Sequence, residues 1–267
     1  MKYTLEDIHN IDLGLVKEFV KICNKYDFKY YIIGGTLLGA IRHKGFIPWD
    51  DDMDIAMPRE DFERFLNVAN NELPSNMKLI TFRNNESYRY YLPRIVDLNT
   101  EIVEKRYADS GEKSNLFIDI FPIDGTPNNK LLRKLYYFRI LYNRLMVSWY
   151  YIDTIDPSRK RSLLEKILII AGKILPTKII INPKKHLEKI DSLMKKNKIE
   201  SSKYIGTIMG AYRTREIVPK SYFGMPTKYD FEDMQLTGPQ QYNEYLTHMY
   251  GDYMQIPKDI STNSHYE

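Results

Sequence analysis

The stretch "YYIIGGTLLGAIRHKGFIPWDDDMDIAM", residues 30–57, places two glycines directly after one apolar run and a group of aspartates directly before another. The first run predicts a strand that ends in a glycine turn, and "TLLGAIRH" predicts a helix that begins at Thr36. The second run, "MDIAM", predicts a short buried strand. Strand, glycine turn, helix and acidic strand therefore follow one another within one short stretch, and they suggest a site for a charged ligand.

The aspartates suggest a metal ion. Side chains alternate between the two faces of a strand, so Asp52 and Asp54 are expected on the same face while Met53 and Ile55 enter the core. Two carboxylates side by side repel each other unless a cation neutralises them. Oxygen ligands of this kind suit Mg²⁺ or Mn²⁺, which also accept phosphate oxygens from a substrate.

The glycines suggest a phosphate. Gly34 and Gly35 allow the backbone to approach an anion closely, and the helix expected from Thr36 offers free N–H donors at its first turn. A glycine turn alone is usually only a turn, and an isolated Asp-x-Asp is usually a solvated loop. Their combination between apolar flanks predicts a metal-assisted phosphoryl or nucleotidyl transfer site.

A third metal ligand is expected from "NLFIDIFPID", residues 115–124. Asp119 stands inside an apolar strand pattern, where an unpaired carboxylate is costly, so it requires either a metal or a basic partner. An ion pair with an arginine is the structural alternative. Asp124 follows Pro122 and is expected in a turn.

Outside these motifs the chain alternates strand-like and helix-like segments, which indicates an α/β or α+β layer. A helix is expected from about residue 5 to 26, and the pattern becomes helical and strongly basic from about 130 to 203. We therefore expect a catalytic core over 1–127, a helical basic segment over 128–203 and an aromatic-rich segment over 204–267. The single cysteine, Cys23, excludes a disulfide framework. The sequence begins without an apolar signal-peptide core, so a cytoplasmic location is expected.

The motif "GGTLLGAIRHKGFIPWDDDMDIAMPREDFERF" resembles the signature of the LicD family of phosphorylcholine transferases, which is shared with fukutin and fukutin-related protein. That family belongs to the nucleotidyltransferase superfamily, and Ile33, Gly34 and Gly35, then Asp52 and Asp54, then Asp119 match its pattern. The closing segment "YNEYLTHMYGDYMQIP" is also similar. The resemblance implies an α+β fold, with a nucleotidyltransferase-like mixed sheet flanked by helices and a helical basic insertion.

The resemblance implies transfer of phosphocholine from CDP-choline to a hydroxyl of a cell-surface glycan precursor, of teichoic acid or lipopolysaccharide type, with release of CMP. Asp52 and Asp54 would hold the metal, and Asp119 would hold the metal or act as general base. Asp50, at the mouth of the same loop, is the second candidate for the base. Candidates for donor binding are Gly34, Gly35, Thr36, Arg42, His43, Trp49 and Arg94. Arg42 is expected to bind the diphosphate in bidentate fashion, whereas for Arg94 an anion clamp and a structural ion pair remain equal alternatives.

Choline recognition requires aromatic faces around a quaternary ammonium. The chain has 22 tyrosines, and the candidates near motifs are Trp49, Tyr88, Tyr90, Tyr91, Trp149, Tyr150 and Tyr151. The same chemistry with another CDP-alcohol, carrying glycerol, ribitol or an aminoethyl group, is the alternative function. A non-catalytic glycan- or nucleotide-binding module is the alternative class. No nucleic-acid partner is expected.

Residues 158–189 combine aliphatic residues at helical spacing with basic clusters at both ends. Charges and Pro176 interrupt this segment, so it does not predict a transmembrane span. Two interpretations remain. The segment is either a helical hairpin packed on the core with a solvated basic rim, or a helix that lies on an anionic membrane surface near a lipid-linked acceptor at the inner face of the membrane.

Overall fold

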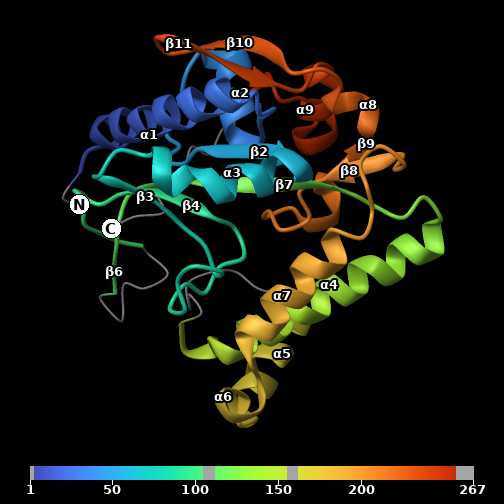
Figure 1. The fold of residues 1–267 in the computed structure, drawn as a ribbon. Helices are drawn as coiled ribbons and strands as arrows, with labels where there is room; N and C mark the ends of the chain where they lie inside the picture. Colours follow the sequence, from blue (N-terminus) through green and yellow to red (C-terminus); the bar gives the residue numbers. More distant parts are fainter. Residues whose placement is uncertain (1–2, 105–111, 155–161, 257–267) are drawn as a thin grey trace.

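The computed structural model describes residues 3–104, 112–154 and 162–256, and it has an α+β fold with a mixed sheet (Figure 1). The main sheet has the order β1-β2-β7-β4-β3, and β8 continues from β7 to β9. Strands β2 and β7 pair in parallel, whereas the other pairs of this sheet are antiparallel. The strands of this sheet are β1 Tyr31–Ile32, β2 Asp54–Pro58, β3 Met77–Ile80, β4 Arg94–Asp97, β7 Phe117–Gly125, β8 Tyr204–Gly206 and β9 Ile217–Pro219.

Two short antiparallel pairs lie outside the main sheet. The first joins β5 Ile102–Val103 to β6 Lys113–Ser114, and the second joins β10 Thr227–Phe231 to β11 Met234–Gly238. The apolar patterns of residues 88–98 and 101–105 predict a pair of strands, and this prediction was wrong: β4 pairs with β3 and β7, whereas β5 pairs with β6.

The first helix follows from local chemistry. Thr4 and Asp7 form a reciprocal capping box at its start, and its buried face includes Ile8, Leu15 and Phe19. The prediction of a helix over about 5–26 is confirmed. The helices are α1 Leu5–Tyr26, α2 Gly34–His43, α3 Arg59–Glu72, α4 Lys130–Tyr150, α5 Leu163–Ile174, α6 Thr177–Ile180, α7 Pro183–Met194, α8 Lys220–Phe223 and α9 Tyr242–Tyr250, with 3-10 turns at Ile152–Thr154 and Arg213–Glu216.

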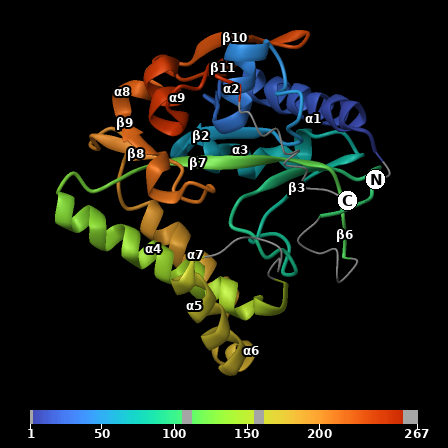
Figure 2. The ribbon, with the colours of Figure 1, turned by 180° about the vertical axis from the view of Figure 1, so that it is seen from behind.

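One face of the sheet is covered by α1 and α3, which contact β7 and each other, and the reverse view places α3 behind β7 (Figure 2). The largest hydrophobic cluster joins Phe19 of α1 and Ile55 of β2 to the C-terminal residues Phe231 and Leu246. The C-terminal segment therefore shares its core with the first half of the chain, and this packing brings α9 against α2.

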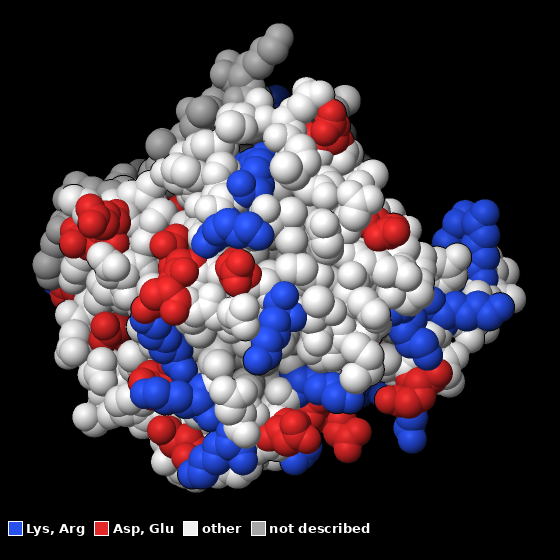
Figure 3. All heavy atoms as spheres, turned by 90° about the horizontal axis from the view of Figure 1, so that it is seen from above, with Lys and Arg blue, Asp and Glu red and all other residues white. Residues whose placement is uncertain are grey.

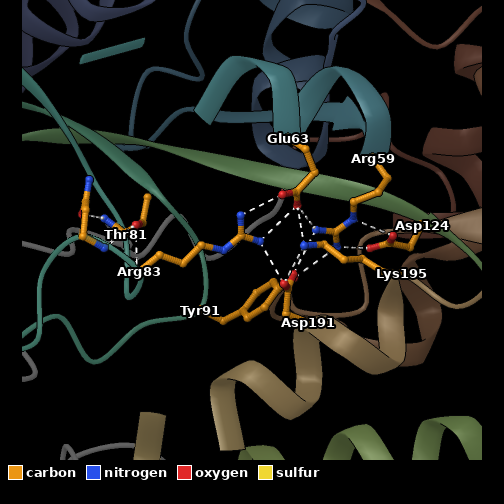
Figure 4. A network of polar contacts seen from close by, with 9 residues as sticks. Arg59, Glu63, Thr81, Arg83, Tyr91, Asp124, Asp191 and Lys195 are labelled. Atoms are coloured by element: carbon orange, nitrogen blue, oxygen red, sulfur yellow. Dashed lines mark hydrogen bonds and ion pairs between the residues drawn. The ribbon is translucent and has the colours of Figure 1, made fainter. Parts of the chain in front are cut away.

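A network of charged side chains ties the helical segment to the sheet (Figure 4). Arg59, at the start of α3, donates to both carboxylate oxygens of Asp124 and, at 3.1 Å, to Asp191 of α7. Arg83 donates to the same Asp191 at 2.9 Å. The expectation that Asp124 lies in a turn was wrong, because β7 continues through Pro122 to Gly125 and the buried Asp124 has Arg59 as its partner.

Candidate functional site

The glycine turn is clamped to the acidic strand. Gly34 has a left-handed backbone with φ of +55° and begins α2, whose N-cap residue Ile33 makes no side-chain capping bond. The Ile33 N–H donates to the Asp54 carbonyl at 3.1 Å, and the Asp54 N–H donates to Thr36 Oγ1 at 2.9 Å. Thr36 therefore fixes the start of α2 against β2, a positioning role that its place in the sequence did not reveal.

Carboxylates lie against this turn. A Cβ added to Gly34 would come within 3.2 Å of Asp54 Oδ2, and one added to Gly35 within 2.7 Å of Asp50 Oδ2. The positive end of the α2 helix dipole thus faces negative charge supplied by the protein itself. Glycine is required at both positions because a larger residue would displace these carboxylates.

Asp54 and Asp119 come together through the sheet. They are partners in the parallel register of β2 and β7, and Asp54 is the first residue of its strand. Burial, with added repulsion from Asp52 and Asp119, raises the pKa of Asp54 well above its usual range. Asp52 precedes β2, so it lies in the loop before the strand. Its proximity to Asp54 therefore does not come from the alternation of side chains along a strand.

Asp119 has a basic partner. Arg94 Nε donates to Asp119 Oδ1 at 3.0 Å, and Arg94 Nη1 donates to Glu104 at 3.1 Å. The guanidinium also lies 3.5 Å from the ring centre of Phe117 and 4.4 Å from that of Tyr90. Burial acts to lower the pKa of Arg94, but Asp119 and the other neighbours outweigh it and the pKa is raised. Arg94 thus forms the structural ion pair that the sequence left as one of two alternatives.

Helix α1 contributes two residues that the sequence interpretation missed. His9 donates to the Asp50 carbonyl at 2.7 Å, and Asp12 is completely buried. Neither carboxylate oxygen of Asp12 has a hydrogen-bond partner among the described residues. Burial, followed by the charges of Asp52 and Asp51, raises the pKa of Asp12 well above its usual range. The available signal was its spacing, four residues after Ile8 and three before Leu15, which places an acid on the apolar face of the helix.

The predicted donor-binding residues Arg42, His43 and Trp49 form one group at the end of α2. Arg42 Nε donates to His43 Nε2 at 2.8 Å, and its Nη1 donates to the Tyr253 carbonyl at 2.9 Å. The guanidinium lies 5.7 Å from the Trp49 ring centre, and the His43 ring meets Trp49 edge-on. Arg42 therefore holds the C-terminal segment, and its contact with a diphosphate stays a prediction.

Aromatic residues near the glycine turn come mainly from the far end of the chain. The Tyr250 hydroxyl lies 3.7 Å from the position of a Cβ on Gly34, and the rings of Tyr250 and Tyr212 meet edge-on at 5.9 Å. Burial raises the pKa of Tyr245, which accepts a hydrogen bond from the Gly34 backbone. The only earlier signal for this group was the resemblance of the closing segment.

Glu216 adds a charge to this aromatic group. It accepts from Thr207 Oγ1 at 2.6 Å and from the Tyr212 N–H at 2.8 Å, and it contributes to the raised pKa of Asp54. Of the aromatic candidates named from sequence, Tyr90 lies against Arg94 of the site. Tyr91 instead joins the Arg59 network, and Trp149 donates to Leu168 within the helical segment.

A divalent cation suits the carboxylates of this group, but the described side chains are not arranged around a common metal position. Within residues 3–104, 112–154 and 162–256, no three His, Cys, Asp or Glu side chains are gathered as a metal site requires. All the donors present are carboxylates, which suit Mg²⁺ or Mn²⁺, and a bound cation would favour the charged forms of Asp54 and Asp12, whose pKa values are raised. Binding would therefore require the side chains of Asp52, Asp54 and Asp119 to turn toward a common point.

The face on the side of β10, β11 and α9 carries interspersed acidic and basic side chains (Figure 3). No broad basic patch of the kind used to bind nucleic acid covers the described part of this face.

The sequence profile of a family described as LicD/FKTN/FKRP, nucleotidyltransferase domain, matches residues 27–165. The lipopolysaccharide cholinephosphotransferase LicD of Haemophilus influenzae is 32% identical over 276 residues, which cover 99% of this chain and 97% of that protein. An uncharacterized protein of Rickettsia typhi is 46% identical over 54 residues, 20% of this chain and 18% of its own length. The profile match includes the glycine turn, the Asp50–Asp54 stretch and Asp119.

Proposed function

Because the chain belongs to the LicD/FKTN/FKRP nucleotidyltransferase-domain family, we propose that it transfers phosphocholine from CDP-choline to a hydroxyl of a cell-surface glycan precursor. The relative from Haemophilus influenzae is named a lipopolysaccharide cholinephosphotransferase, and it aligns with nearly the whole chain. The observation that carries the proposal is the register of Asp54 with Asp119, next to the glycine turn that begins α2. The acceptor class is a lipopolysaccharide or teichoic acid precursor.

In the proposed reaction the acceptor oxygen attacks the phosphorus that bears choline. A new P–O bond forms, the P–O bond to CMP breaks, and CMP leaves with the electron pair of that bond. The hydroxyl proton passes to a carboxylate. We assign this role to Asp50, because Asp119 already uses one carboxylate oxygen for Arg94. Asp50 lies against Gly35 and its backbone is held by His9.

Asp52, Asp54 and Asp119 are the residues proposed to hold Mg²⁺ or Mn²⁺. Such an ion, when bound, would neutralise diphosphate charge and stabilise the departing CMP. The raised pKa of the partly buried Asp54 supports this assignment, since a nearby cation would favour its charged form. The first-turn N–H groups of α2 would add partial positive charge at the same place.

The donor alcohol is proposed to lie against Tyr212 and Tyr250, with Glu216 behind them. Aromatic faces and a carboxylate suit a quaternary ammonium, and these residues adjoin Gly34 and Asp54. Glycerol and ribitol groups carry no positive charge for these aromatic faces and this carboxylate to attract, so the observation favours choline over those two groups.

A panel of CDP-choline, CDP-ethanolamine, CDP-glycerol and CDP-ribitol tests the proposal. CMP release would be followed with Mg²⁺, Mn²⁺ or a chelator, with and without a lipid-linked glycan fraction. We expect metal-dependent release from CDP-choline, increased by the acceptor. In Tyr212→Ala, KM should rise more for CDP-choline than for CDP-glycerol. A preference for CDP-glycerol or CDP-ribitol would select the alternative donor, and binding without release from any donor would indicate a non-catalytic module.

None of the described helices is both long enough and apolar enough to cross a membrane. We propose that the reaction takes place in the cytoplasm at the inner face of the membrane, because a lipid-linked acceptor would be presented there.

A further inference from the structure

Helix α5 and the short α6 expose an unusual amount of aliphatic surface. Ile167, Ile170 and Ile174 are 54%, 58% and 78% exposed, and Ile179 of α6 is 87% exposed. With Leu163 they form the surface called here the α5–α6 face. A helical hairpin that packed on the catalytic core would bury such residues. The interpretation of this segment as a core-packed hairpin with only a basic rim in solvent is therefore wrong for the α5–α6 face.

The contacts of α5 with α4 fix which side is exposed. The Trp149 Nε1 of α4 donates to the Leu168 carbonyl at 2.9 Å, and a Cβ on Gly172 would come within 2.7 Å of the Trp149 ring. Gly172 lies on the side of the helix opposite Ile170 and Ile174. The packed side of α5 is thus the side with the small residue, and the aliphatic side is left without a partner among the described residues.

The charges beside this face are basic. Helical spacing places Lys166 and Lys173 next to the aliphatic stripe, and both are exposed. The nearby acids are already paired, Glu165 with Arg213 at 3.7 Å and Asp153 with Lys178 at 2.6 Å. Lysines flanking an aliphatic stripe complement a surface that is apolar inside and anionic at its boundary.

The position of the α5–α6 face at one end of the molecule allows contact with a planar surface. In both views of the ribbon, α5 and α6 form the end of the molecule that lies farthest from β10 and β11 (Figures 1 and 2). A protruding end can contact a plane while the sheet and the glycine turn stay outside it.

We propose that the α5–α6 face docks the protein on an anionic lipid bilayer, with α5 parallel to the membrane plane and its lysines among the headgroups. This inference goes beyond the proposed transfer reaction and does not depend on it. The bilayer would cover a helix face that no other described part of the molecule covers.

Co-sedimentation with vesicles tests the inference without any donor or acceptor. Vesicles of phosphatidylcholine alone would be compared with vesicles that also contain phosphatidylglycerol, at low and at high salt. We expect binding to the anionic vesicles that weakens at high salt. Replacing Lys166 and Lys173 by Gln should weaken it about thirtyfold, since each basic residue near the surface contributes a factor of about five.

The triple variant Ile167→Ser, Ile170→Ser, Ile174→Ser should lose binding to the anionic vesicles while its melting temperature stays near that of the wild type. The matched control is Leu98→Ser with Met225→Ser, two exposed apolar residues outside the face, which should bind as the wild type does. Absence of binding to anionic vesicles at low salt would overturn the inference. So would light scattering that shows a dimer lost in the triple variant, because a second copy would then cover the face. Either result would leave the donor panel unaffected.

Discussion

Asp119 of β7 faces Arg94 of β4 in the antiparallel register, and Arg94 Nε donates to Asp119 Oδ1 at 3.0 Å. Asp119 is at the same time the partner of Asp54 in the parallel register on its other side. One carboxylate thus has a buried cation on one side and a candidate metal ligand on the other. Its second oxygen makes no hydrogen bond within the described structure that competes with a metal, so the ion pair orients Asp119 without excluding that role.

Asp119→Asn should therefore lower both activity and stability. The substitution leaves the Arg94 guanidinium, whose side chain is 7% exposed, with Glu104 as its remaining ion-pair partner. We expect the free energy of unfolding to fall by about 1–3 kcal/mol, the usual range for a hydrogen bond to a charged group. Urea denaturation would measure it, with Glu101→Gln as the control because its Lys113 pair is exposed. An unchanged free energy of unfolding would show that the pair contributes nothing to folding.

Asp54→Asn should lower activity without lowering the stability of the metal-free protein. The pKa of Asp54 is raised in the folded protein, so its charged form destabilises the metal-free fold as pH rises. With a chelator present at neutral pH, the variant should melt at or above the wild-type temperature. With the metal supplied, it should lose at least about 10²-fold in the rate of CMP release. Asp233→Asn, in an exposed pair with Lys17, should change neither. Near-normal turnover of Asp54→Asn would contradict its assignment to the metal.

Asp12→Asn should stabilise the protein increasingly toward high pH. A carboxyl whose pKa is raised above the usual 3.8 contributes stability at low pH and loses it as pH rises toward the folded pKa. The advantage of the variant should grow by about 1.4 kcal/mol per pH unit within that window. Urea denaturation with a chelator at pH 5 and at pH 8 would measure it.

Asp7, on the same helix as Asp12, provides the control for this experiment. The pKa of Asp7 is lowered by its hydrogen bonds to Thr4, so Asp7→Asn should be destabilising above that pKa. A variant at Asp12 that lost stability at pH 8 would mean that its charge has a compensating partner.

Gly35→Ala should reduce activity because the new methyl group would lie 2.7 Å from Asp50 Oδ2 and displace that carboxylate. We expect a loss of about tenfold or more in CMP release with a small change in melting temperature. Gly14→Ala, inside α1 with nothing within 4 Å of the new methyl group, is the matched control. It should stabilise the protein by about 0.5–1 kcal/mol and keep full activity. Equal activity in both variants would contradict the assignment of Asp50 to the active site.

Much of the fold follows from short stretches of the sequence. The capping box of Thr4 and Asp7, the apolar period of α1, and the apolar flanks of the glycine turn each act within a few residues. The strand pattern around Asp119 is equally local. These elements were confirmed, although α2 begins at Gly34 rather than at Thr36 and β2 begins at Asp54 rather than at Met53. The resemblance of residues 34–65 and the family match agree, because the motif contains the residues that form the turn and the acidic strand.

Only the tertiary structure decided which side chains meet. Arg94 with Asp119, Arg59 with Asp124, and Tyr250 with Gly34 are brought together by strand register and by packing of the C-terminal segment. The same packing buries Asp12 among carboxylates and leaves Ile174 exposed. Periodicity in a sequence reports which face of an element is apolar, but it does not report what covers that face. The partner of a charge or of an apolar stripe depends on elements far away in the chain, whose contacts exist only after the whole molecule has packed.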